Sequence, residues 1–244
     1  MRKIIIDTDP GQDDALAMMT AFGAKKDLNV LGVTCVAGNV PLDLTSVNAL
    51  KICELSGFFS VPVFRGSPAP LKRKLITAEH VHGKTGLDGT DLSVKKKELE
   101  PTDAVDFIIE CTEKYRDEKI TICALGPLTN VAKVLKKDSV LTESIEEIVL
   151  MGGGFFEGGN ITPAAEFNIY VDPEAAKIVL ESGLKITMLP LDVTHKTLVQ
   201  RNFLEKLRKS GKNSAIQAAK LLDFFERYDV EKYGSQGGPL HDPN

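Results

Sequence analysis

The chain has 244 residues, of which 43% are hydrophobic and none is tryptophan, and this length is enough for one domain with a buried core. Its 30 basic and 34 acidic residues leave a formal net charge of −4, and because the basic residues are scattered, nucleic acid is not an expected partner. No apolar run approaches the roughly 18 residues that span a membrane and the first residues are too polar for a signal peptide, so we expect a cytoplasmic protein.

Short β-branched runs alternate with segments of helical apolar spacing along the chain. The expected strands are residues 3–7, 28–36, 119–125, 145–151 and 185–189, and the expected helices are residues 15–22, 46–56, 104–115 and 173–182. This alternation predicts a single α/β domain over residues 1–244 with a mostly parallel, Rossmann-like, doubly wound sheet. In such a sheet ligands bind beyond the carboxyl ends of the strands, so the residues that follow each strand are candidates for a functional site.

An acidic cluster follows the first expected strand. Asp7, Asp9, Asp13 and Asp14 fall within eight positions, interrupted by a Pro-Gly turn. Capping of the following helix accounts for one or two of these carboxylates, but not for all four. Because four neighbouring anions at the end of a buried strand repel one another, the cluster predicts a site for a hard cation, Ca²⁺ or Mg²⁺. A cage of several carboxylates suits Ca²⁺ better.

Two later segments carry further polar side chains. Near the end of the sequence, His241 and Asp242 lie in a Gly/Pro-rich stretch and offer a fifth carboxylate, although hydrogen bonding within a loop explains them equally well. In residues 163–173, Glu166 and Asn168 share a face if the segment is extended. Such a face suits a sugar, and the alternative is an edge strand with polar side chains in solvent.

The four cysteines are single residues within apolar stretches and lack the paired spacing of a metal site. We therefore expect reduced, buried thiols rather than disulfides or metal ligands. They are Cys35, Cys53, Cys111 and Cys123.

Seven motifs in the sequence resemble one protein family. They are DTDPGQDDA (7–15), VAGN (36–39), HGKTGLDG (82–89), GPLTN (126–130), MGG (151–153), AEFNIYVDPEA (165–175) and HDP (241–243). Together they strongly resemble the nucleoside hydrolases, the family of inosine-uridine-preferring and pyrimidine-preferring ribohydrolases. The resemblance runs from one end of the chain to the other.

The resemblance implies Ca²⁺-dependent hydrolysis of the N-glycosidic bond of a ribonucleoside to free base and ribose, a reaction of purine and pyrimidine salvage. The carboxylates of Asp9, Asp14 and Asp242 match the metal ligands of the family, and the main-chain carbonyl of Leu125 matches a further ligand. Asp9 also corresponds to the base that activates the attacking water, and His241 corresponds to the general acid at the departing base.

The ribose contacts are also implied by the resemblance. Asp13, Asn39 and Asn168 match groups that hold the ribose hydroxyls. Asn160 and Glu166 match residues near the 5′-hydroxyl and its neighbours. We therefore expect these five side chains to bind the sugar.

The expected contacts at the base rest on the same motifs. His82, Met151 and Phe167 lie in motifs that reach the substrate. Tyr233 matches a tyrosine that pyrimidine-preferring relatives bring to the base, and His241 is typical of the group that polarises the base through histidine. Both features favour pyrimidine nucleosides.

The sequence departs from the family pattern at its end. Relatives continue beyond the position of Asn244 with further helix and sheet, so we expect the chain to lack this C-terminal segment. One alternative is therefore a nucleoside- or ribose-binding protein that turns over weakly or not at all. A remote alternative is a Mg²⁺-dependent aspartyl phosphatase, although Pro10 and Gly11 directly after the second aspartate argue against it. The resemblance further implies a homodimer or homotetramer.

Overall fold

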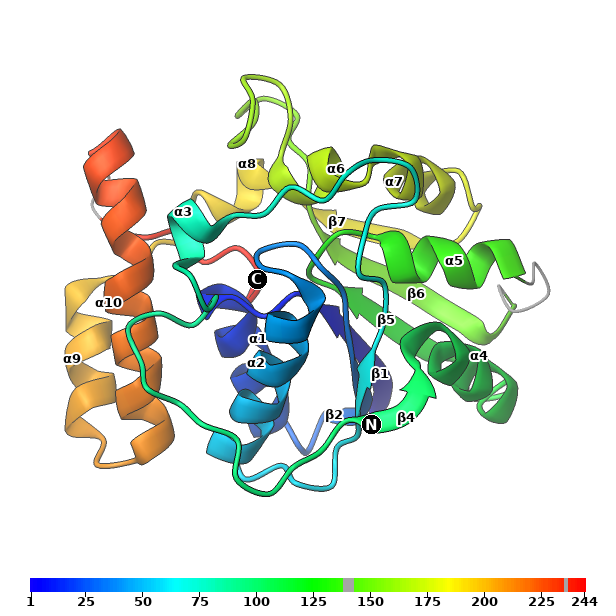
Figure 1. The fold of residues 1–244 in the computed structure, drawn as a ribbon, viewed down its shortest axis with the longest axis horizontal. Helices are drawn as coiled ribbons and strands as arrows, with labels where there is room; N and C mark the ends of the chain where they lie inside the picture. The colour runs from blue at the N-terminus through cyan, green and yellow to red at the C-terminus, as the bar shows by residue number, and fades with distance from the viewer. Residues whose placement is uncertain (138–142, 235–236) are drawn as a thin grey trace.

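One parallel sheet forms the centre of the molecule. The computed structural model describes residues 1–137, 143–234 and 237–244, apart from the side chains of Asp229, Lys232 and Tyr233. Within these ranges seven strands pair in the order β4-β3-β2-β1-β5-β6-β7, and every pair is parallel (Figure 1). The strands are β1 (Arg2–Thr8), β2 (Leu28–Cys35), β3 (Val63–Arg65), β4 (Glu100–Asp103), β5 (Ile120–Ala124), β6 (Ile145–Met151) and β7 (Ile186–Leu189).

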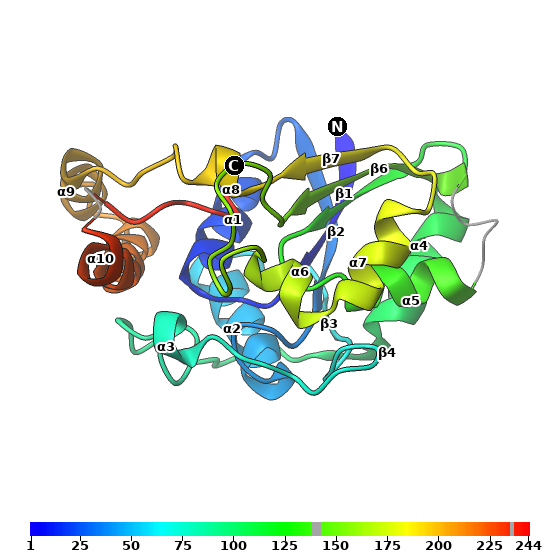
Figure 2. The same ribbon diagram turned by 90° about the horizontal axis from the view of Figure 1, so that it is seen from above.

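Helices cover both faces of this sheet. α1 and α2 pack on one face, α4, α5 and α7 cover the other, and α9 and α10 form a helical pair beside α1 (Figure 1 and Figure 2). The helices are α1 (Gln12–Gly23), α2 (Leu42–Leu55), α3 (Glu79–His82), α4 (Ala104–Lys114), α5 (Thr129–Lys137), α6 (Phe167–Val171), α7 (Pro173–Leu180), α8 (Leu191–Thr194), α9 (Arg201–Lys209) and α10 (Asn213–Tyr233). No helix in the described ranges is both long and apolar enough to cross a membrane.

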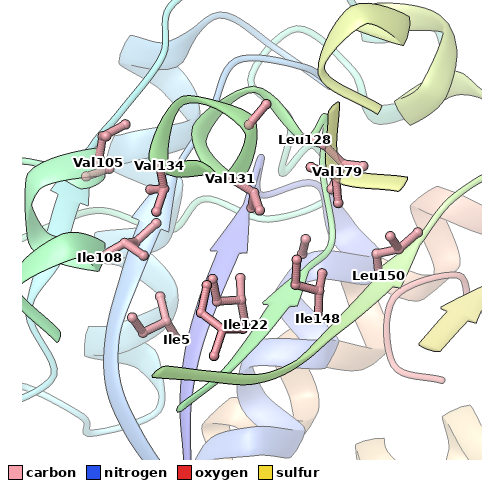
Figure 3. Packing of buried hydrophobic residues seen from close by; sticks show 14 of the residues in the cluster. Ile5, Val105, Ile108, Ile122, Leu128, Val131, Val134, Ile148, Leu150 and Val179 are labelled. Atoms are coloured by element: carbon pink, nitrogen blue, oxygen red, sulfur yellow. The ribbon is translucent and has the colours of Figure 1, made fainter. Parts of the chain in front are cut away.

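The core explains why the three central residues of the first strand, Ile4 to Ile6, are all apolar. Ile5, Ile122 and Ile148 point to one face of the sheet, where they are fully buried against α4, α5 and α7 (Figure 3). Ile4 and Ile6 point to the opposite face and pack with α1 and α2. Successive residues of a strand alternate between faces, and β1 is central and covered on both, so all three of its isoleucines are buried.

The strand order reverses at β1, and this reversal positions the candidate site. The chain runs from β1 outward through β2 and β3 to β4, and then returns to place β5 on the other side of β1. Such a switch point opens a crevice at the carboxyl ends of the strands, where ligands bind in this class of fold. Asp9 follows β1 and Leu125 follows β5, so two of the predicted site residues lie at the crevice.

The predicted fold class is confirmed, and the five expected strands and four expected helices are present with small shifts at their ends. The interpretation of residues 163–173 as extended is wrong, because α6 begins at Phe167. The carboxylate of Glu166 accepts hydrogen bonds from the backbone N–H groups of Asn168 and Ile169, which caps and starts this helix. The short strands β3 and β4 were not predicted.

Candidate active site

Asp9 and Asp14 lie at the base of the crevice, and each is only 1% exposed. The backbone N–H of Asn39 donates a hydrogen bond of 2.7 Å to Asp9, and the side-chain amide of Asn39 donates one of 3.1 Å to Asp14. The hydroxyl of Thr8 and the backbone N–H of Gly11 also donate to Asp14. Because Asp14 lies in the first turn of α1, the helix dipole also favours its negative charge.

Two glycines enclose the carboxylate of Asp9. A Cβ atom on Gly38 would lie 2.1 Å from one carboxylate oxygen of Asp9, and a Cβ atom on Gly126 would lie 2.2 Å from the other. Both separations are far shorter than any real contact of a Cβ atom, so neither position can accept a side chain unless Asp9 moves. The loops after β2 and β5 therefore fix the position of this carboxylate.

Three carboxylates converge beside this floor. Oxygen atoms of Asp13, Asp14 and Asp242 all lie within 4.8 Å of one another, and Asp242 comes from the last segment of the chain. Burial raises the pKa of Asp9 well above its usual range, and the neighbouring charge of Asp14 raises it further. Burial likewise raises the pKa of Asp242, with added repulsion from Asp13, Asp14 and Asp9.

This donor set fits a hard cation. Oxygen atoms of Asp14 and Asp242 lie within 4.8 Å of each other, so two carboxylates meet where either a proton or a cation must balance their charge. Several carboxylate oxygens and a carbonyl oxygen are the ligands that Ca²⁺ prefers. The carbonyl of Leu125 accepts a hydrogen bond of 2.7 Å from the side chain of Asn168, and its second lone pair leaves room for a further interaction.

The last residues of the chain are held against the segment that follows α8. The backbone N–H of Val199 donates to the carbonyl of Gly238 at 3.0 Å, and the backbone N–H of Leu240 donates to the carbonyl of Thr197 at 2.8 Å. This short antiparallel pairing places Asp242 beside the N-terminus of α1.

The start of α6 forms the wall of the site next to β6. Besides capping α6, Glu166 accepts a hydrogen bond of 2.9 Å from the backbone N–H of Gly153. Burial raises the pKa of Glu166, and its bonds to backbone N–H groups lower it. The side-chain carbonyl of Asn160 accepts a bond of 2.9 Å from the N–H of Phe167, and Asn168 also donates to the carbonyl of Met151 at 3.3 Å.

The opposite wall is aromatic. The ring of Phe225 in α10 lies 5.5 Å from the ring of His82 and 6.3 Å from the ring of His241. The Nδ1 atom of His82 lies 2.7 Å from the side-chain carbonyl oxygen of Gln12, and Nδ1 of His241 lies 2.8 Å from the hydroxyl of Thr194. Burial is the main cause that lowers the pKa of His82 to about 3, and it also lowers the pKa of His241.

A cavity of about 560 Å³ lies between these walls. Its lining includes most of the residues that the sequence indicates, namely Asp13, Asn39, His82, Leu125, Met151, Asn160, Glu166, Phe167, Asn168, His241 and Asp242. Asp9 and Asp14 lie beneath the lining, and the side chain of Tyr233 lies outside the described residues. A cavity of this size is sufficient for a nucleoside-sized molecule.

Asp7, the remaining acid of the cluster, has a structural environment. It is fully buried and accepts hydrogen bonds of 2.8 Å from the side chain of Asn130 and 2.6 Å from the hydroxyl of Thr34. Burial raises its pKa to about 6, although both hydrogen bonds lower it. Asn130 also donates to the carbonyl of Cys35, so this group joins β1, β2 and α5 behind the site.

Several residues of the cavity were not predicted from the sequence. Phe225 and Tyr228 come from α10, and His80 and His195 come from the segments around α3 and α8. None of them lies directly after an expected strand, so the expectation that site residues follow the strands does not identify them. Gln12 lies within the acidic motif but carries no charge, and its contact with His82 appears only in three dimensions.

Comparison with known proteins agrees with this geometry. Residues 4–244 match the family described as inosine-uridine preferring nucleoside hydrolase. The pyrimidine-specific ribonucleoside hydrolase RihA of Photobacterium profundum is 48% identical over 243 residues, which are 99% of this chain and 77% of the relative.

Two solved structures are similar over nearly the whole chain. A plant nucleoside hydrolase has a TM-score of 0.94 at 36% identity, and the match covers 99% of this chain and 76% of the other. A purine-preferring ribonucleoside hydrolase from Gardnerella vaginalis also has a TM-score of 0.94, at 33% identity, with 99% and 78% covered. These matches do not support the aspartyl phosphatase alternative. The chain therefore belongs to the inosine-uridine preferring nucleoside hydrolase family and is a ribonucleoside hydrolase, an enzyme that cleaves N-glycosidic bonds.

Proposed function

We propose that the enzyme hydrolyses pyrimidine ribonucleosides in a Ca²⁺-dependent reaction, with the sugar on the carboxylates and the base against the aromatic wall. The observation that carries this proposal is the convergence of Asp13, Asp14 and Asp242 within 4.8 Å at a cavity that His82 and His241 also line. The carboxylates would stabilise positive charge on the sugar, and the histidines would stabilise negative charge on the leaving base.

The carboxylate end suits the sugar. Cleavage of a glycosidic bond passes through an oxocarbenium-like state in which positive charge develops on the ribose. Buried carboxylates stabilise that charge more strongly than exposed ones, because bulk water screens them less. In the proposal Asp13, Asn39 and Asn168 hold the ribose hydroxyls, and Asn160 and Glu166 lie near the 5′-hydroxyl.

The metal would be held by Asp9, Asp14, Asp242 and the carbonyl of Leu125. When bound, Ca²⁺ would hold the two neighbouring ribose hydroxyls and lower the pKa of a water molecule. Because Ca²⁺ polarises water less than Zn²⁺ does, a carboxylate base is still needed, and in the proposal Asp9 accepts the proton. Its clamped position between two glycine backbones suits this role, because a general base has to lie within hydrogen-bonding distance of the water.

The aromatic end suits the leaving base. Negative charge accumulates on the base as the C–N bond breaks, and a proton donor stabilises it. In the proposal His241 supplies this proton or hydrogen bond through Nε2, since Thr194 occupies its Nδ1. Phe225 lies near both His82 and His241 and offers a flat surface on which a base could stack.

A preference for pyrimidines is supported by the relatives. RihA, at 48% identity, is described as pyrimidine-specific, whereas the purine-preferring enzyme of Gardnerella vaginalis is 33% identical. Because relatives with different base preferences match this chain, base preference belongs to the proposal rather than to the family assignment.

The proposal is tested by measuring the release of reducing sugar from uridine, cytidine and inosine, with Ca²⁺ and with a chelator. We expect release that is fastest with the pyrimidine nucleosides, lost with chelator and restored by Ca²⁺. Asp9→Asn is expected to abolish release, while Asp43→Asn, at a side chain that is 81% exposed, serves as the matched control. Binding of nucleosides without release of ribose would favour the alternative of a binding protein.

A further inference from the structure

We propose that Gln12 is a positioning residue that holds His82 in the tautomer with hydrogen on Nδ1. His82 then presents Nε2 to the cavity as a hydrogen-bond acceptor, for an N–H group of the base. This inference rests on the proposed function for the location of the base, but not for the tautomer of the histidine. It follows from the hydrogen bonds of one buried amide.

The orientation of the Gln12 amide is determined by two backbone carbonyls. Its nitrogen, Nε2, donates to the carbonyl of His82 at 2.9 Å and to the carbonyl of Asp88 at 3.3 Å. Carbonyl oxygens accept hydrogen bonds and never donate them, so the reversed amide would place oxygen against oxygen. Because Gln12 is completely buried, water does not offer alternative partners.

The amide oxygen of Gln12 therefore faces His82. It lies 2.7 Å from Nδ1 of the imidazole ring. An amide oxygen is only an acceptor, so the hydrogen of this bond has to be carried by Nδ1. In a neutral imidazole the other nitrogen, Nε2, then has a free lone pair and no hydrogen.

The surroundings of His82 agree with a neutral ring that is open on one side. Burial lowers its pKa to about 3, and the nearby rings of His241 and His80 lower it further. His82 lines the cavity, and among the described residues Nε2 has no hydrogen-bond partner. The acceptor lone pair is therefore available to a ligand in the cavity.

The second histidine of the aromatic wall is not restricted in this way. The Nδ1 atom of His241 pairs with the hydroxyl of Thr194, which can donate or accept. His241 can therefore carry its hydrogen on Nε2 and donate it to a leaving base, whereas His82 cannot. One acceptor and one donor on the same wall would match a base that presents an N–H group beside carbonyl oxygens, as a uracil ring does.

The tautomer is tested directly by NMR of the whole protein with ¹⁵N-labelled histidine. The chain has only 4 histidines, so the His82 signals can be assigned from a His82→Asn variant. Two-bond proton–nitrogen correlations distinguish a protonated Nδ1 from a protonated Nε2. We expect a protonated Nδ1 and a bare Nε2 at neutral pH; a protonated Nε2 or a charged ring would overturn the proposal. This measurement needs no turnover, so it stands or fails separately from the proposed function.

Two variants distinguish the effect of Gln12 on the His82 ring from its hydrogen bonds to the backbone carbonyls of His82 and Asp88. Gln12→Met removes the amide oxygen that accepts from Nδ1 of His82. We expect His82 in this variant to be a mixture of the Nδ1–H and Nε2–H tautomers. The matched control is Asn48→Leu, because the buried amide of Asn48 also donates to two backbone carbonyls, of Pro10 and Thr85, but does not contact His82. We expect the control to keep the His82 signature, and an unchanged signature in Gln12→Met would contradict the assignment.

The role of the acceptor is tested by kinetics with uridine. Loss of one ground-state hydrogen bond is expected to raise KM by about 3- to 10-fold in Gln12→Met with kcat little changed. A fall in kcat at constant KM would instead mean that His82 takes part in the transition state, and would overturn the acceptor role. If the unmodified enzyme releases no ribose, the proposed function fails while the NMR result still decides the tautomer.

Discussion

The carboxylates of Asp14 and Asp242 lie within 4.8 Å of each other, although they belong to the first helix and to the last segment of the chain. Burial raises the pKa of both. Asp14 alone would be a helix-capping aspartate, and Asp242 alone would be an aspartate in a loop. The cation site exists only where the two segments meet. Removal of the Asp242 carboxylate should therefore weaken metal binding and, without metal, raise the stability of the protein, because repulsion from Asp13, Asp14 and Asp9 is relieved.

We predict that Ca²⁺ stabilises the enzyme and that Asp242→Asn removes this effect. At a free Ca²⁺ concentration of about 100 times Kd, binding adds about 2.7 kcal/mol, which corresponds to a rise in Tm of about 5 to 10 °C. In chelator the order should reverse, and Asp242→Asn should melt above the unmodified protein because it relieves repulsion between carboxylates. Thermal melts with and without Ca²⁺ measure both, with Asp43→Asn as control. Equal Ca²⁺ shifts in all three proteins would exclude Asp242 as a ligand.

We predict that Gly38→Ala and Gly126→Ala each destabilise the protein by about 1 to 3 kcal/mol and strongly reduce kcat, because the added methyl group would displace the carboxylate of Asp9. Neither glycine has a positive φ angle, so the effect arises from space and not from backbone strain. Gly23→Ala is the control, since a Cβ atom there meets nothing within 4 Å. Urea unfolding and ribose release measure the two effects, and a neutral result at Gly38 would refute the clamp.

The effect of replacing His241 on kcat should depend on the leaving group of the substrate. General acids typically contribute about 10²- to 10⁴-fold, so His241→Ala should lower kcat for uridine by that order. A ribonucleoside analogue that releases p-nitrophenolate needs little protonation and should be hydrolysed almost as fast as by the unmodified enzyme. Thr194→Val, which removes the partner of Nδ1, should give a smaller loss with uridine. Equal losses with both substrates would argue against a role at the leaving base.

The cysteines are free thiols, as the sequence predicts, and three of the four are buried. Burial raises the pKa of Cys53 to about 12 and that of Cys111 and Cys123 to about 11. Because the thiolate is the reactive form, we expect slow reaction with Ellman's reagent in the native protein at pH 8 and release of four equivalents in denaturant. Rapid reaction of the native protein, or fewer equivalents after unfolding, would contradict this prediction.

The parts of the site that follow strands could be predicted from the sequence. Asp9, Asn39 and Leu125 each follow a β-branched run, and parallel strands bring their carboxyl ends to one edge of the sheet. The local sequence pattern is therefore sufficient to predict that these three residues lie together at the base of the crevice. The same reasoning gives the fold class, because alternation of strand and helix leaves few ways to bury both faces of a sheet.

Other parts depend on contacts that no local pattern contains. α6 is only 5 residues long and starts because the side chain of Glu166 caps it, so the alternation of polar residues there does not mark an extended segment. Phe225 reaches the cavity from a helix far along the chain, and its place is determined by packing of α10 on α1 and α3. The partner of His82 is likewise a neighbour in space only, 70 positions away in Gln12.

The antiparallel pairing of residues 197–199 with residues 238–240 closes the base of the segment that carries α9 and α10. The described residues between Val199 and Gly238, which include α9, α10 and Phe225, form a detour from the sheet that begins and ends at this pairing. His241 and Asp242 lie just after the closure and are attached to the sheet side of it. Changes in α9 and α10 that keep their packing on α1 would therefore leave the separation of Asp14 and Asp242 the same. In this architecture the surface next to the base can diverge without altering the chemistry at the sugar.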